Sequence, residues 1–182
     1  ENIDPKLNAI ISDVICSLDG QVVYGYPDIS STYLKLAKWL DVYPENLLFS
    51  HGSDGVIRST FDAFVGSDDS VLLTSPTFMM YEVYAKMCGA NLIKVNYDSS
   101  NNGPVLEVDR LIDGILQHQP KLVCIPNPDS PTGTVFQKMD LESIISTCEE
   151  CGSIILVDEA YYPFCEVSAI SLINNYPNLI IA

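Results

Sequence analysis

Two acidic residues near the end of the chain give the clearest chemical signal in the sequence. Asp158 and Glu159 come directly after residues 154–157, an apolar run with the composition of a buried strand. Burying a carboxylate is unfavourable unless a cation compensates for its charge. The sequence therefore predicts a carboxylate that serves a cationic partner at the end of this strand.

Three further segments have residue types that could bind a ligand. Residues 50–55 open a predicted helix at 56–65, where free amides and the positive end of the helix dipole can bind a phosphate. An ordinary helix start capped by Ser53 is the alternative. Residues 76–81 bring aromatic rings that could stack on a planar ligand or pack in the core. Residues 126–133 form a turn-rich loop.

Short apolar runs alternate with helical patterns along the chain. Strands are expected at 47–49, 71–73, 92–95, 122–125, 154–157 and 179–181, and helices at 7–18, at 29–40 after an Asp28 cap, and between the later strands. This alternation predicts an α/β fold, a three-layer αβα arrangement with a mostly parallel sheet. Ligands of such sheets bind beyond the carboxyl ends of the strands, where the segments described above are placed. Residues 98–104 are expected to form an exposed loop.

The composition excludes several classes of protein. The chain has 182 residues, 47% of them hydrophobic, which suits a globular domain. With 24 acidic and 9 basic side chains, its net charge of -15 disfavours nucleic acid and anionic membranes as partners. No apolar run reaches the roughly 20 residues of a spanning helix, and the first residues do not resemble a signal peptide. We expect a cytoplasmic protein.

The six cysteines lie in otherwise apolar segments, as reduced core thiols do. Cys148 and Cys151 have the spacing of half a zinc site or of a redox pair. No second pair stands at a matching distance, and neither histidine is near in sequence. We therefore predict two thiols near a helix end and no metal site.

Four motifs together resemble the class I/II pyridoxal-phosphate (PLP) aminotransferases, which have the aspartate aminotransferase fold. The motifs are Gly52-Ser53-Asp54, Pro76-Thr77-Phe78, Asn127-Pro128-Asp129-Ser130-Pro131-Thr132-Gly133 and Asp158-Glu159-Ala160-Tyr161. Their order and spacing match over nearly the whole chain. Tyr26-Pro27-Asp28, Tyr81 and Tyr176-Pro177-Asn178-Leu179 make the chain most similar to histidinol-phosphate aminotransferases.

The resemblance implies an N-terminal helix and loop at 1–27 and the PLP-binding large domain of a fold-type I enzyme at 28–182. The amides of Gly52, Ser53 and Asp54 would hold the cofactor phosphate, so the Asp54 side-chain charge need not oppose binding. Phe78 would stack on the pyridine ring. Asp158 would pair with the ring nitrogen and keep it protonated, which makes the ring an electron sink.

Three more residues would complete the site by the same resemblance. Tyr161 would donate a hydrogen bond to the phenolic oxygen of the cofactor. Ser130 stands where relatives usually have asparagine, and its hydroxyl can still donate one hydrogen bond with a shorter reach. Tyr26 would reach the phosphate of the neighbouring subunit, so we expect a homodimer with a shared active site.

The implied reaction is transamination of an amino acid or amino phosphate such as histidinol phosphate, with a 2-oxo acid such as 2-oxoglutarate as acceptor. Relatives carry the Schiff-base lysine shortly after the segment that ends here at Ala182. We expect a fragment that lacks this lysine and the small C-terminal domain of an active parent enzyme. A PLP decarboxylase of the threonine-phosphate type and a catalytically inactive module are the alternatives. A dinucleotide-binding domain is disfavoured because no Gly-x-Gly-x-x-Gly follows a strand.

Overall fold

The computed structural model describes residues 4–182, except the side chains of Gln21 and Val23. The chain divides into two compact units, of which the first ends at Leu47 and the second runs from Leu48 to Ala182. The predicted cofactor-binding domain at 28–182, preceded by a helix and loop at 1–27, stays a prediction. The helix that follows Pro27 contacts the short helix at Pro44–Asn46, and this contact keeps it in the first unit.

The first unit is helical. Its elements are α1 (Pro5–Ser17), α2 (Gly20–Tyr24), α3 (Ser30–Leu40) and the 3-10 helix η1 (Pro44–Asn46). The helices predicted at 7–18 and 29–40 are confirmed. Asp28 lies one residue before the N-cap position of α3, yet its Oδ1 accepts a hydrogen bond from the Ser30 amide at 2.9 Å. This carboxylate therefore helps the helix to begin.

The second unit is built on a parallel sheet of five strands in the order β2-β1-β5-β6-β7. The strands are β1 (Ser70–Ser75), β2 (Asn91–Asn96), β5 (Leu122–Pro126), β6 (Ile154–Asp158) and β7 (Leu179–Ile181). The helices are α4 (Gly52–Phe64), α5 (Met80–Cys88), α6 (Val108–His118) and α7 (Lys138–Glu150), with 3-10 turns η2 (Tyr162–Phe164) and η3 (Ile170–Leu172). The predicted α/β fold with a mostly parallel sheet is confirmed.

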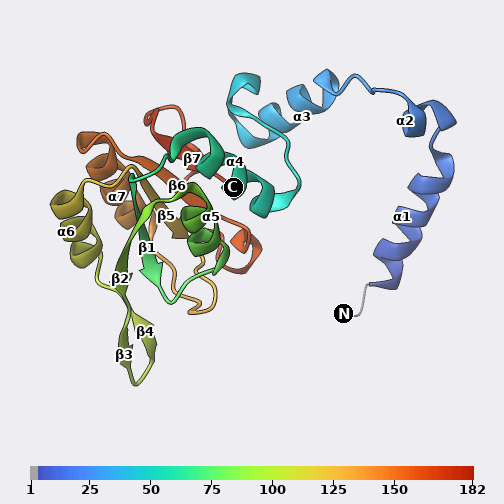
Figure 1. The fold of residues 1–182 in the computed structure, drawn as a ribbon. Coiled ribbons are helices and arrows are strands. Elements are labelled where there is room, and N and C mark those ends of the chain that lie inside the picture. Colours follow the sequence, from blue (N-terminus) through green and yellow to red (C-terminus); the bar gives the residue numbers. More distant parts are fainter. Residues whose placement is uncertain (1–3) are drawn as a thin grey trace. The chain divides into compact units, whose positions relative to one another are not determined.

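Successive strand residues pack against opposite faces of the sheet, because side chains alternate along a strand. In β1, Val71 and Leu73 pack with Ile57 and Phe61 of α4, whereas Leu72 packs on the other face with the core residues of α6 and α7. Figure 1 shows α6 and α7 on one side of the sheet and α4 and α5 on the other. The second unit thus has three layers, as expected for strands buried on both faces.

Two segments differ from the expectations. Residues 47–49 form no strand. This short apolar run follows η1 at the boundary between the two units in the chain, and Leu48 is 78% exposed. Residues 98–104, expected to be a loop, contribute an exposed antiparallel hairpin of β3 (Asp98–Ser100) and β4 (Gly103–Val105). Its polar residues hid the strand pattern.

Among residues 4–182 no helix has both the length and the apolar character that a membrane span requires.

The strand order reverses beside β1. The chain passes from β1 to β2 on one side and then returns to place β5 on the other side of β1. Ligands of open parallel sheets bind at such a reversal, in the crevice beyond the carboxyl ends of the strands. The loops that follow β1 and β5 flank this point.

Candidate functional site

Asp158 is the last residue of β6 and is buried, with 6% of its surface exposed. Its Oδ2 accepts a hydrogen bond from the hydroxyl of Tyr81 at 2.8 Å, and its Oδ1 accepts one from the Ala160 amide at 3.0 Å. Each oxygen therefore has a donor from the protein and can accept a further hydrogen bond. This carboxylate stands at the carboxyl edge of the sheet, as the sequence predicted.

Helix α5 connects Asp158 to the predicted ring-stacking residue. The Phe78 ring, about a third of which is exposed, meets the Tyr81 ring edge to face, with 5.8 Å between the ring centroids and 87° between the planes. Tyr81 in turn bonds Asp158. An aromatic face and a buried acid are thus joined through one buried tyrosine.

The N-terminus of α4 leaves backbone amides free. Gly52, Ser53 and Asp54 form its first turn, where amides have no partner within the helix. The N-cap is His51 and makes no side-chain capping bond, so the alternative in which Ser53 caps the helix is wrong. Gly52 has φ +72°, a conformation that glycine adopts without strain. A helix start of this kind can bind a phosphate.

The charge of Asp54 is turned toward α5. Both carboxylate oxygens of Asp54 accept from the Tyr84 hydroxyl, at 3.1 and 3.0 Å. Tyr81 and Tyr84 are three residues apart and so share one face of α5. The same helix face therefore holds the helix start at Asp54 and the acid Asp158.

The loop after β5 is fixed by its own side chains. Asn127 is fully buried; its Oδ1 accepts from the Phe136 amide at 2.8 Å, and its Nδ2 donates to the Phe136 carbonyl at 3.2 Å. The Asn127 amide donates to the Asp158 carbonyl at 2.8 Å. Gly133, with φ +72°, closes the turn by donating its amide to the Asp129 carbonyl at 2.8 Å. Ser130, half-buried, is held within this turn.

Asp129 joins the two loops that flank the strand reversal. Its carboxylate accepts from Thr77, in the loop after β1, at 3.1 Å, and from Thr132, in its own loop, at 2.5 Å. Burial raises the pKa of Asp129, and the two threonine hydroxyls partly oppose this shift. The segment that carries Phe78 is thereby tied to the loop that carries Ser130.

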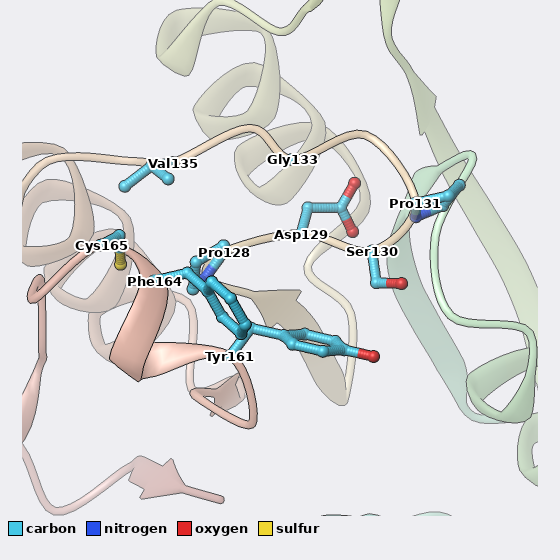
Figure 2. Close-up of a pocket in the computed structure, with 9 residues that line it drawn as sticks. All are labelled: Pro128, Asp129, Ser130, Pro131, Gly133, Val135, Tyr161, Phe164 and Cys165. Carbon is cyan, nitrogen blue, oxygen red and sulfur yellow. The ribbon is translucent and has the colours of Figure 1, made fainter. Parts of the chain in front are cut away.

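Ser130 and Tyr161 line one pocket of about 420 Å³. Figure 2 shows their side chains on the same side of the loop, with the Asp129 carboxylate pointing away from Tyr161. The pocket wall also includes Pro128, Val135, Phe164 and Cys165. This volume lies in the range of small-molecule sites, and the hydroxyls of Ser130 and Tyr161 give it groups that can donate hydrogen bonds.

Glu159 holds the segment that follows Asp158. Its carboxylate accepts from the Ser168 hydroxyl and the Ala169 amide, both at 2.7 Å. Burial raises the pKa of Glu159, while these two donors lower it. The loop between Asp158 and Ala169, which contains Tyr161, is therefore closed on itself.

Tyr26 lies in the first unit, between α2 and α3, with its side chain fully exposed. Its contact with a cofactor phosphate in a neighbouring subunit remains a prediction. The other predicted residues all lie in the second unit, and the structure links Phe78 with Asp158 and Ser130 with Tyr161.

The sequence analysis gave no role to the side chains that connect these groups, although several of them lie in the motifs it singled out. Tyr81, Tyr84, Thr77, Asp129 and Asn127 make the hydrogen bonds described above. The three-residue spacing of the two tyrosines indicates a shared helix face, but no sequence pattern names their partners.

The second unit thus offers a buried carboxylate, an exposed aromatic face, two hydroxyls and uncapped helix amides. These groups suit a planar nitrogen heterocycle that carries a phosphate: the carboxylate can accept from a protonated ring nitrogen, and the amides can bind the phosphate. The structure shows one donor on each Asp158 oxygen, and a carboxylate oxygen can accept a second hydrogen bond, as such a ring requires.

The family model for aminotransferase class I and II matches residues 6–182. The histidinol-phosphate aminotransferase of Caldanaerobacter subterraneus subsp. tengcongensis is 36% identical over 173 residues, which are 94% of this chain and 47% of that protein. That of Sulfurisphaera tokodaii is 32% identical over 159 residues, 87% of this chain and 44% of the relative. The chain spans about half the length of the curated relatives it matches.

Solved structures show the same fold. The histidinol-phosphate aminotransferase of Sinorhizobium meliloti, solved in complex with pyridoxal-5'-phosphate, superposes with a TM-score of 0.80 at 20% identity and covers 98% of this chain and 47% of that one. The enzyme of Clostridium acetobutylicum gives a TM-score of 0.73 at 21% identity, covering 96% and 49%. Because the family model matches almost every residue, the chain belongs to the aminotransferase class I and II family.

Proposed function

We propose that this chain forms the cofactor-binding part of a PLP-dependent aminotransferase. Asp158 carries the proposal: it is a buried carboxylate at the end of β6, each of its oxygens can accept a further hydrogen bond, and the Asn127 amide of the loop after β5 bonds its carbonyl. When bound, PLP supplies a protonated ring that accepts electrons from a substrate carbon. The fold of PLP-bound relatives supports this assignment.

The chain's own residues would bind and orient the cofactor. The first-turn amides of α4, at Gly52, Ser53 and Asp54, hold the phosphate, and Phe78, about a third of which is exposed, stacks on the ring. Asp158 accepts a hydrogen bond from the protonated ring nitrogen and stabilises its positive charge. Tyr161 and Ser130, which line one pocket, donate to the phenolic oxygen.

For the substrate we propose an amino phosphate such as histidinol phosphate, with a 2-oxo acid such as 2-oxoglutarate as acceptor. The similarity to proteins named histidinol-phosphate aminotransferases supports this choice. We also propose a homodimer in which Tyr26 reaches the phosphate of the neighbouring subunit. The first unit exposes this tyrosine completely, which leaves it free for such a contact.

The test is to express the chain in its full natural length, load it with PLP and add histidinol phosphate and 2-oxoglutarate. We expect glutamate to form, and D158N to bind PLP but form glutamate far more slowly. With threonine phosphate, which has an α-carboxylate, in place of histidinol phosphate, release of carbon dioxide without glutamate would identify a decarboxylase instead. Binding of PLP without any turnover would identify an inactive module. Failure to bind PLP would refute the proposal that the chain forms a cofactor-binding domain.

A further inference from the structure

Tyr81 makes a buried contact with the acid at the centre of the site. Its side chain is fully buried on α5, and its hydroxyl donates to Asp158 Oδ2 at 2.8 Å across 77 residues of sequence. The second Asp158 oxygen is held by the Ala160 amide at 3.0 Å. With one donor on each oxygen, the plane of the carboxylate is fixed.

The direction of this hydrogen bond is also fixed. Burial, followed by the nearby charge of Asp158, raises the pKa of Tyr81 well above its usual range. The phenol therefore stays neutral over the working pH range of a protein and can only donate to the carboxylate. Asp158 keeps its acceptor role as a result.

Helix α5 is anchored on both sides of this contact. One turn further along, Tyr84 donates to both oxygens of Asp54, in the first turn of α4. The ring of Tyr81 supports Phe78 edge to face at 5.8 Å. The helix that carries Tyr81 is thus bonded to α4, and the Tyr81 ring packs against Phe78, while its hydroxyl bonds Asp158.

We propose that Tyr81 is a positioning residue that aims the free lone pair of Asp158 at the ring nitrogen of the cofactor. The inference rests on the proposed function, since it needs PLP in this site. Tyr81 does not touch the ring nitrogen; it acts through the carboxylate. Its removal should therefore weaken only the interaction that passes through that nitrogen.

The test compares the affinities of wild type and Y81F for PLP and for its 1-deaza analogue, which has carbon in place of the ring nitrogen. Loss of a hydrogen bond to a carboxylate should weaken PLP binding about tenfold. The affinity for the analogue should change less than about twofold, because it has no ring nitrogen for Asp158 to meet. Equal losses for the two ligands would mean that Tyr81 has only a packing role, and the inference would fail.

Tyr84→Phe is the matched control, since it removes the same hydroxyl from the same helix face but at the Asp54 end. Y84F should change the affinity for PLP and the affinity for the analogue by the same factor. If Y84F loses the preference for PLP over the analogue as Y81F does, helix packing and not the Asp158 contact determines that preference. If wild type binds neither ligand, the proposed function fails, and the Tyr81 inference fails with it.

A structure of the wild-type protein with PLP gives a second measurement that does not depend on whether Y81F folds. We expect the Tyr81 hydroxyl to remain within hydrogen-bond distance of Asp158. One or both oxygens of Asp158 should lie within hydrogen-bond distance of the ring nitrogen. A Tyr81 hydroxyl that has left Asp158 in the bound state would overturn the inference.

Discussion

Replacing Asn127 by alanine should destabilise the second unit substantially. The Asn127 side chain is fully buried and pairs with both backbone groups of Phe136, at 2.8 Å to the amide and 3.2 Å to the carbonyl. Phe136 itself is only 3% exposed, so water cannot readily replace the lost partner. Alanine at this position leaves one buried donor and one buried acceptor without a hydrogen bond.

Each unsatisfied buried group costs about 1–3 kcal/mol, so N127A should lower the free energy of unfolding by about 2–6 kcal/mol. Urea titration followed by circular dichroism measures this change. Because the same loop carries Ser130 and bonds the Asp158 carbonyl, PLP affinity should fall together with stability.

Asn174→Ala is the control, since Asn174 is exposed and its replacement should change the free energy of unfolding by less than about 0.5 kcal/mol. A loss below about 1 kcal/mol in N127A would refute the reasoning, because it would mean that the two Phe136 groups find other partners.

Three further changes have defined outcomes. Because burial raises the pKa of Asp129, the folded state holds this proton more tightly than the unfolded chain, so wild type should lose stability relative to D129N as the pH rises from about 4 to 7; an unchanged difference between their unfolding midpoints over this range would contradict the shift. S130A should weaken PLP binding by about three- to tenfold, the value of one neutral hydrogen bond, in a fluorescence titration, and unaltered affinity would remove Ser130 from the site. G52A should lower the free energy of unfolding by about 1–2 kcal/mol through backbone strain alone, because φ is +72° and no atom lies within 4 Å of an added Cβ; a thermal midpoint equal to wild type would mean that the loop relaxes.

The sequence predicted the sheet well because its strands are buried on both faces. Continuous apolar runs such as 122–125 are typical of buried parallel strands when they alternate with helical patterns. The same criterion failed at 47–49, an apolar run after η1 in which Leu48 and Phe49 are exposed and Leu47 is half-buried. It also missed the hairpin at 98–105, because β3 consists of exposed polar residues and neither strand is buried in the core.

The site was predicted in its end groups but not in its connections. Asp158 and Phe78 were recognisable because an acid and an aromatic ring follow strands at the carboxyl edge of the sheet. The bond from Tyr81 to Asp158 spans 77 residues, and that from Thr77 to Asp129 spans 52. Such pairings depend on how strands are ordered in space, which local periodicity does not contain.

The most direct test of the account is nuclear magnetic resonance of PLP labelled with ¹⁵N in its ring and bound to the protein. We predict a protonated ring nitrogen in wild type and a neutral one in D158N at the same pH, because the buried carboxylate stabilises the positive charge. A neutral nitrogen in wild type, or the same protonated signal in both proteins, would contradict the role of Asp158 and with it the proposed site.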